Sequence, residues 1–148
     1  DTVANAFTGI KEELEIAVDE DRDDLTVRMD TIDLESVLTH LYINSIRSLE
    51  RTKGRKRKVL FAYDYKDGGL TIKFSDNGIG IPVKKLGEVF EPFKFGHNED
   101  DEKKHGHGLG LHIVKKIMEH YGGTAEAVSR SQGVTIILRF PDIKKVAA

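Results

Sequence analysis

Residues 104–123 read KHGHGLGLHIVKKIMEHYGG, and this stretch decides the fold. Alternate glycines are followed by apolar residues at helical spacing, which predicts a glycine loop that runs directly into an amphipathic helix. The glycine pair at 122–123 ends that helix. A helix N-terminus presents free N–H groups and a partial positive charge, and Gly106, Gly108 and Gly110 carry no side chain to keep an anion away. The stretch is therefore suited to binding a phosphate chain.

A flexible glycine hinge before an ordinary surface helix is the simpler interpretation of the same stretch. Two familiar phosphate loops are excluded by spacing. No Gly-Lys-Ser/Thr follows as a P-loop requires, and the glycines are spaced G-x-G-x-G rather than the G-x-G-x-x-G of dinucleotide-binding folds. A hinge and a different kind of nucleotide loop both stay open at this point.

Composition narrows the class of protein. At 148 residues the chain is long enough for one domain with a core, and its net charge of −2 gives no broad field for nucleic acid or membranes. It has neither a signal peptide nor an apolar run long enough to cross a bilayer. The absence of cysteine excludes disulfides and thiolate metal sites and suits a cytosolic domain. Because the chain opens at Asp1 without Met, we expect a piece of a longer protein.

The N-terminal part gives the weakest pattern. Apolar residues at helical spacing between Val3 and Val18 predict a helix, and the acidic run at 19–24 predicts a solvated connector rather than a cation site. Alternation over residues 25–30 then predicts a strand. The predicted organisation is an N-terminal helix with a charged connector over residues 1–24 and one domain over 25–148.

A long helix is predicted from Asp33 to Arg51. On the side opposite its apolar arc, His40, Asn44 and Arg47 lie within about 60° of one another, so an imidazole, an amide and a guanidinium share one face. A polar surface face is the simpler interpretation. The basic run at 53–58 could contact nucleic acid or an acidic partner, but its place between a helix and a strand favours a solvated connector.

Four strands are predicted over residues 59–65, 70–75, 124–129 and 134–140, with a tight hairpin turn at 66–69. The second strand ends in Asp76, Asn77 and Gly78, and a helical pattern begins at Pro82 and continues to Phe90. A carboxylate at a strand end followed by glycines can accept a hydrogen bond from a ligand amine. An EF-hand is excluded because its ligand alternation and closing Glu are missing.

Residues 97–104 are polar and lack periodicity, which predicts a mobile loop of the kind that covers active sites. Four histidines nearby raise the possibility of zinc: His97, His105, His107 and His112. No carboxylate or fourth ligand falls at a characteristic spacing from them, which disfavours a zinc site.

Taken together, these motifs resemble the GHKL ATP-binding fold, and specifically the catalytic and ATP-binding domain of sensor histidine kinases. Four boxes occur in the family's order: the N box at 40–45, the G1 box at 76–80, the F box at 90–93 and the G2 box at 106–111. The resemblance covers about residues 25 to 141. It implies an α/β (α+β) two-layer sandwich, in which a mixed, largely antiparallel sheet has helices on one face.

The resemblance also implies a site for ATP and Mg²⁺ between the helical layer and the lid. The resemblance implies catalytic roles for His40, Asn44 and Arg47, of which Asn44 would hold Mg²⁺. It also implies that Asp76 accepts a hydrogen bond from the adenine amino group. The implied nucleotide-binding residues are Asn44, Asp76, Gly78, Gly80, Ile81, Phe90, Phe93, Lys94, Gly106, His107, Gly108, Leu109, Gly110, Leu111 and Thr135.

Three positions depart from the family's pattern. His40 stands where ATP-hydrolysing relatives carry a Glu that activates water, which argues for phosphoryl transfer to an amino-acid acceptor rather than hydrolysis. A His here is similar to the chemotaxis histidine kinase, where it faces the terminal phosphate. Ser48 replaces an aromatic residue that lies against the base, and Ser131 replaces the first Gly of a C-terminal Gly-x-Gly.

The resemblance implies a protein-histidine kinase of two-component signalling. The acceptor histidine would lie on dimerisation helices that this sequence lacks. A response regulator would be a partner of the full protein. We expect the fragment to be monomeric and cytoplasmic, by itself or as the cytoplasmic part of a membrane-bound sensor, without nucleic-acid or membrane contacts. Two alternatives stay open. One is an anti-sigma-type serine kinase, which usually keeps the missing Glu, and the other is a nucleotide-gated interaction module.

Overall fold

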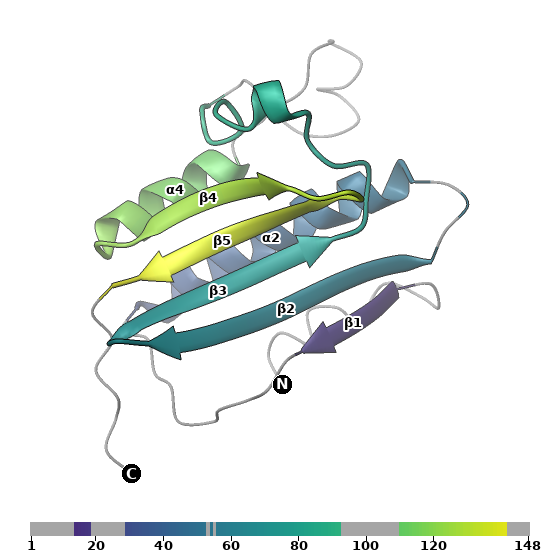
Figure 1. Cartoon of the computed structure of the whole chain (residues 1–148). Coiled ribbons are helices and arrows are strands. Elements are labelled where there is room, and N and C mark those ends of the chain that lie inside the picture. The colour runs from purple at the N-terminus through teal and green to yellow at the C-terminus, as the bar shows by residue number, and fades with distance from the viewer. Residues whose placement is uncertain (1–13, 19–28, 53, 55, 93–109, 142–148) are drawn as a thin grey trace.

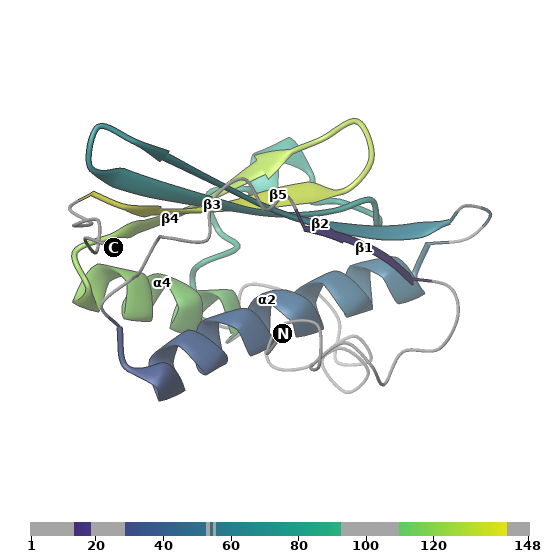
Figure 2. The same cartoon turned by 90° about the horizontal axis from the view of Figure 1, so that it is seen from below.

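The computed structural model describes residues 14–18, 29–52, 54, 56–92 and 110–141. Five strands form one sheet in the order β1-β2-β3-β5-β4, and both described α-helices cover the same face of it (Figures 1 and 2). The elements are β1 (Leu14–Val18), α2 (Thr31–Glu50), β2 (Arg57–Lys66), β3 (Gly69–Asp76), the 3-10 helix η1 (Val83–Lys85), α4 (Gly110–His120), β4 (Thr124–Ser129) and β5 (Val134–Phe140). β1 runs parallel to β2, and the other pairs are antiparallel. The predicted two-layer sandwich with a mixed, largely antiparallel sheet is confirmed.

The core lies between the sheet and the helices. Because side chains of a strand alternate between faces, the register places Phe61, Phe74 and Ile136 in one row on the helical side. From the helices, Leu41 and Met118 are fully buried against this row. The apolar arcs predicted for the two long helices therefore form the inner layer, and burial of each such side chain stabilises the fold by about 1.5–3 kcal/mol.

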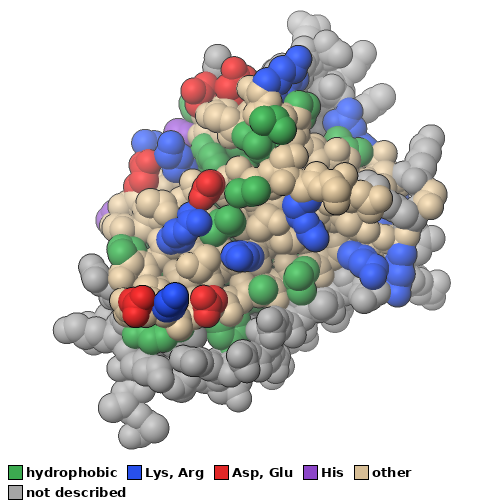
Figure 3. All heavy atoms as spheres, in the orientation of Figure 1, with side chains coloured by type: hydrophobic (Ala, Val, Ile, Leu, Met, Phe, Trp, Pro, Cys, Tyr) green, Lys and Arg blue, Asp and Glu red, His purple; other side chains and the backbone are tan. Residues whose placement is uncertain are grey.

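The opposite face of the sheet is covered by neither described helix (Figure 2). Figure 3 views this face and shows charged, apolar and other side chains interspersed over it. Glu126 and Arg139 form an ion pair of 2.7 Å there, between half-exposed side chains of β4 and β5, and such a pair contributes little to stability. The alternation of buried and polar positions along these strands is what a sheet with one wet face requires. Within the described ranges, every helix is too short or too polar to cross a membrane.

The four strands predicted from residue 59 onward are confirmed, each within two residues of its predicted bounds. The β2–β3 hairpin turns through Asp67 (φ 52°) and Gly68 (φ 81°). Positive φ at both central positions is the type I′ geometry, whose twist matches that of the strands. The turn at 66–69 was therefore predictable from its Asp-Gly pair.

The N-terminal segment differs from its prediction. Residues 14–18 form β1 and pair in parallel with β2, whereas their spacing predicted the end of a helix. Pairing with the edge of β2 satisfies the backbone of this segment, and tertiary pairing of this kind overrides local propensity. The sheet therefore extends across the predicted boundary at residue 24. The rest of the predicted helix, the acidic connector and residues 25–28 lie outside the described residues.

The start of α2 also differs from its prediction. The helix begins at Thr31, two residues before the predicted start, because Asp30 is its N-cap and accepts a hydrogen bond from the Ile32 backbone N–H at 2.8 Å. Alternation had assigned Asp30 to the end of a strand.

The helix predicted from Pro82 to Phe90 is wrong. Only Val83–Lys85 is helical, as one 3-10 turn, and turns follow it. Gly87 lies in the middle of the predicted helix, where glycine costs about 1 kcal/mol relative to alanine. Val89 and Phe90 are nevertheless buried. The apolar spacing therefore indicated buried positions correctly, although the segment is not a helix.

Tyr121 joins the end of α4 to the start of α2. Its hydroxyl donates to Asp33 Oδ2 at 2.5 Å and accepts from the Asp30 backbone N–H at 3.0 Å. The hydrogen bond to Asp33 is the main reason that the pKa of Tyr121 is raised. Tyr121→Phe removes both interactions, so we expect the free energy of unfolding to fall measurably.

Urea denaturation of the wild type, Tyr121→Phe, Asp33→Ala and the double variant tests this link. We expect the two single losses not to add in the double variant, because both changes remove the same hydrogen bond. Fully additive losses would contradict a direct interaction.

Candidate functional site

Asp76 is a buried carboxylate at the end of β3, with only 2% of its surface exposed. Ser45 Oγ donates to Oδ2 at 3.2 Å, Ser48 Oγ donates to Oδ1 at 3.2 Å, and the Gly78 backbone N–H donates to Oδ1 at 2.9 Å. Burial raises the pKa of Asp76, while these hydrogen bonds and the charge of Arg130 oppose that rise. The Asp76 carboxylate is therefore a hydrogen-bond acceptor that is shielded from solvent and anchored to helix α2.

Ser45 was missed by the sequence analysis, and Ser48 was noted only because it replaces an aromatic residue that lies against the base. Ser48 lies beneath the loop after β3: a Cβ on Gly78 would come within 2.0 Å of its Oγ. The loop backbone thus rests directly on α2, at a position that a larger side chain would fill. A signal for Ser45 was present in the sequence, because Ser45 continues the buried stripe of Val37, Leu41 and Leu49 with a hydroxyl.

The loop after β3 is held in shape by two other strands. Asn77 Nδ2 donates to the Lys56 carbonyl at 2.8 Å, and Asn77 Oδ1 accepts from the Lys58 N–H at 2.7 Å. From β5, the backbone at Gly133 (φ 87°) comes so close that a Cβ there would lie 1.8 Å from the Asp76 carbonyl oxygen. Asn77 and Gly133 were not predicted as site residues, and both act by positioning the Asp76 segment.

His40 packs against the first residue of α4. A Cβ on Gly110 would lie 3.6 Å from His40 Nδ1, so the imidazole lies beside the helix N-terminus, whose N–H groups have no partner in the helix. Burial lowers the pKa of His40, and the charge of Arg47 lowers it further. The imidazole is therefore neutral near pH 7, where one ring nitrogen keeps a lone pair. The structure thus brings His40, Arg47 and Gly110 together, as the predicted site requires.

Asn44 lies one helical turn after His40 and is half-buried. Its side chain makes no hydrogen bond with any other residue in the described ranges. An amide oxygen that has no partner among the described residues and lies near a helix N-terminus fits Mg²⁺, which prefers oxygen ligands and is commonly bound by one or two protein groups together with substrate phosphates. Apart from this, no cluster of three His, Cys, Asp or Glu within the described residues could hold a metal ion.

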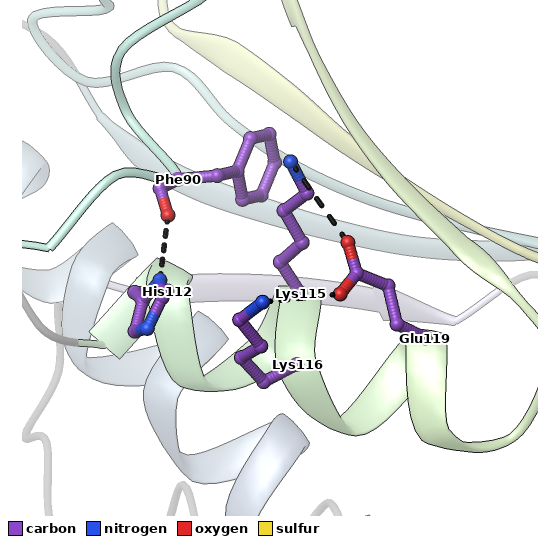
Figure 4. Close-up of polar contacts among 5 residues, drawn as sticks. All are labelled: Phe90, His112, Lys115, Lys116 and Glu119. Carbon is purple, nitrogen blue, oxygen red and sulfur yellow. Dashed lines mark hydrogen bonds and ion pairs between the residues drawn. The ribbon is translucent and has the colours of Figure 1, made fainter.

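The start of the F box is tied to the first turn of α4. His112 Nδ1 donates to the Phe90 carbonyl oxygen at 3.1 Å (Figure 4), which fixes the proton on Nδ1. The side chain of His112 is half-buried. Farther along α4, Lys115 and Lys116 pair with Glu119 at 4.0 and 3.4 Å (Figure 4), at exposed positions where such pairs stabilise little.

Thr135 is separated from the other predicted site residues. In the register of β3 and β5, Val134 lies opposite Asp76, and Thr135 lies opposite Ser75. Neighbouring residues of a strand point to opposite faces, so Thr135 lies on the sheet face away from Asp76, where its hydroxyl is 2.8 Å from that of Ser75. The structure therefore does not bring Thr135 together with Asp76, and its assignment to the nucleotide site stays a prediction.

Of the remaining predicted residues, Ile81, Phe90 and Leu111 are buried, and Gly80 takes a positive φ of 74°. Phe93, Lys94, Gly106, His107, Gly108 and Leu109 lie outside the described residues. The predicted loop at 97–104, and the other three histidines considered for zinc, lie outside them as well.

A shallow hollow of about 260 Å³ adjoins the loop after β3. It is lined by residues 78–82 and by the β4–β5 turn at 129–133, but by none of His40, Asn44 and Asp76. Ser131, which departs from the family's pattern, is exposed at this hollow.

Comparison with known proteins gives consistent matches. The family model "Histidine kinase-, DNA gyrase B-, and HSP90-like ATPase" matches residues 29–144. Sensor protein kinase WalK of Staphylococcus haemolyticus is 34% identical over 110 residues, which cover 70% of this chain and 18% of that protein. WalK of Staphylococcus aureus is 40% identical over 73 residues, or 49% of this chain and 18% of that protein. The chain thus spans about 18% of the length of these relatives.

Solved structures agree with the fold. The catalytic domain of histidine kinase ThkA has a TM-score of 0.72 at 26% identity, covering 88% of this chain and 81% of that one. The ATP-binding domain of PrrB from Mycobacterium tuberculosis has a TM-score of 0.72 at 22% identity, covering 96% and 90%, which supports the fold alone. The resemblance inferred from the four boxes is confirmed, and the chain belongs to the histidine kinase-, DNA gyrase B- and HSP90-like ATPase family.

Proposed function

We propose that this chain is the ATP-binding catalytic domain of a protein-histidine kinase. The observation that carries the proposal is the meeting of three features along α2: the buried acceptor Asp76, the amide of Asn44, which has no hydrogen-bond partner among the described residues, and His40 against the start of α4. Relatives described as sensor protein kinases support it.

Each group has a task in this proposal. Asp76 accepts a hydrogen bond from the adenine amino group, and the N-terminus of α4 binds phosphate oxygens. Asn44 would hold Mg²⁺, which would neutralise phosphate charge during the transfer. Neutral His40 contacts the terminal phosphate. The bond between the γ-phosphorus and the ADP oxygen then breaks as a bond to the acceptor histidine nitrogen forms.

In the same proposal, the acceptor histidine and the response regulator that later receives the phosphoryl group lie outside this chain. A ThkA structure similar to this chain (TM-score 0.68, 25% identity, covering 87% of this chain and 34% of that one) is a complex with response regulator protein TrrA. We therefore propose a response regulator as the final phosphoryl acceptor, reached through a histidine-bearing helical hairpin, and a cytoplasmic location for the domain. These relatives favour phosphoryl transfer over the serine-kinase and interaction-module alternatives.

The test is transfer of label from [γ-³²P]ATP to purified histidine-containing helical hairpins of sensor kinases. We expect the wild type to label at least one hairpin. His40→Gln is expected to lower the transfer rate by about 100-fold, while ADP affinity changes by less than about threefold, because the side chain acts at the terminal phosphate.

His120→Gln is the matched control, since this exposed histidine lies at the far end of α4. It should transfer at the wild-type rate. Binding of ATP without transfer to any hairpin would contradict the kinase proposal and favour the interaction module.

A further inference from the structure

The Asp76 carboxylate is held by two hydroxyl groups whose role the proposed function does not explain. Ser45 and Ser48 are one helical turn apart on α2, and each donates to a different oxygen of Asp76 at 3.2 Å. Ser45 is only 2% exposed, so its hydroxyl has no access to bulk water and depends on this carboxylate.

The surroundings of Asp76 offer it little other support. In the register of the sheet its cross-strand neighbours are Val59 on β2 and Val134 on β5, both buried and apolar. The Gly78 N–H donates from the following loop at 2.9 Å. Among the described residues, Arg130 on the β4–β5 turn is the charged group whose field reaches the carboxylate. Two of the three hydrogen bonds that oppose the cost of burial thus come from the serine pair.

We propose that Ser45 and Ser48 are positioning residues that keep Asp76 ionised and aimed at the ring amino group of the nucleotide at neutral pH. The inference rests on the proposed function for its ligand, but its electrostatic part concerns the free domain. An amino group donates to an ionised carboxylate, whereas a protonated Asp76 would lose acceptor capacity. Hydrogen bonds that favour the charged form oppose protonation. As the pH is lowered, variants without the hydroxyls should therefore lose binding at a higher pH than the wild type does.

A simpler alternative is that both serines only fill space. Gly78 lies so close to Ser48 that any larger side chain would collide with the loop, so small size matters there in either case. Serine-to-alanine changes keep the small size and remove only the hydroxyl, which separates the two explanations.

The experiment measures the affinity for Mg²⁺-ADP by calorimetry from about pH 5.5 to about pH 8.5, in the wild type, Ser45→Ala, Ser48→Ala and the double variant. Titration of the ADP phosphates and of His40 is common to all four proteins and cancels in the ratio to wild type. We expect the double variant to bind about tenfold more weakly at about pH 6 and within about twofold of wild type at about pH 8.5.

Ser36→Ala is the matched control, because Ser36 is a half-buried serine on the same helix that makes no hydrogen bond to Asp76. It should follow the wild type at every pH. Equal weakening of the double variant across the whole pH range would overturn the proposal in favour of packing alone.

A second readout needs no nucleotide. The ¹³C shift of the Asp76 side-chain carboxyl, assigned against Asp76→Asn, reports its titration in the free domain. We expect the midpoint to rise in both single variants and further in the double variant, and an unchanged midpoint would overturn the proposal. If the wild type binds no ADP while the midpoints still shift, the proposed function fails and the serine pair's effect on Asp76 stands.

Discussion

Asp76→Asn is expected to lower the affinity for Mg²⁺-ADP by roughly 10- to 100-fold without unfolding the domain. The amide can keep the hydrogen bonds at this position, because its oxygen accepts from the Gly78 N–H and from Ser48, while its NH₂ group donates to the Ser45 hydroxyl. The ligand amino group, however, loses a charged acceptor and meets an N–H donor. Titration calorimetry with ADP and with a non-hydrolysable ATP analogue measures the loss.

Asp64→Asn is the control for that change, since Asp64 is an exposed carboxylate on β2. It should bind like the wild type. Undiminished binding by Asp76→Asn would remove Asp76 from the nucleotide site.

The same variant has a predictable effect on stability. Because the pKa of Asp76 is raised above its ordinary value of 3.8, this group contributes stability that is fully present below about pH 3.8 and is lost as the pH rises through the folded-state value. Asn removes that dependence. We expect Asp76→Asn to be at least as stable as the wild type at neutral pH and to lose this advantage on acidification, as measured by urea denaturation. A site residue that costs stability is typical of function.

Gly133→Ala is expected to destabilise the domain by about 3 kcal/mol or more. Two costs combine: the residue has a φ of 87°, and its Cβ would lie 1.8 Å from the Asp76 carbonyl oxygen, which is backbone and cannot rotate away. Separation of β5 from β3 at this point would also displace Asp76. Urea denaturation measures the stability, and calorimetry on the folded fraction measures the loss of ADP binding.

Gly68→Ala separates the two costs. Gly68 has a similar φ of 81° but lies in open space at the hairpin turn, so it should lose only about 1–2 kcal/mol from backbone strain and keep nucleotide binding. If Gly133→Ala and Gly68→Ala lost the same amount of stability, the close contact between residue 133 and Asp76 would contribute nothing to the loss.

The N-terminal segment and Thr135 show why part of the structure could not be predicted. The apolar residues of 14–18 suit either a helix or an edge strand, and only the presence of β2 beside them decides between the two. Thr135 was assigned to the nucleotide site through the resemblance to the family. The face on which it lies depends on the strand register, and a shift of one residue moves every side chain to the other face.

The sequence by itself determined the elements whose causes are local. Strand alternation, the helical arcs, the Asp-Gly turn and the four ordered boxes depend on neighbours within a few positions, and they led to the correct fold family and to Asp76, Asn44 and His40. Only the tertiary structure decided that Ser45 and Ser48 donate to Asp76, that Gly133 presses on its backbone and that His40 meets Gly110. The physical reason is that these contacts join segments far apart in the chain, and their geometry exists only after the core has packed the helices against the sheet.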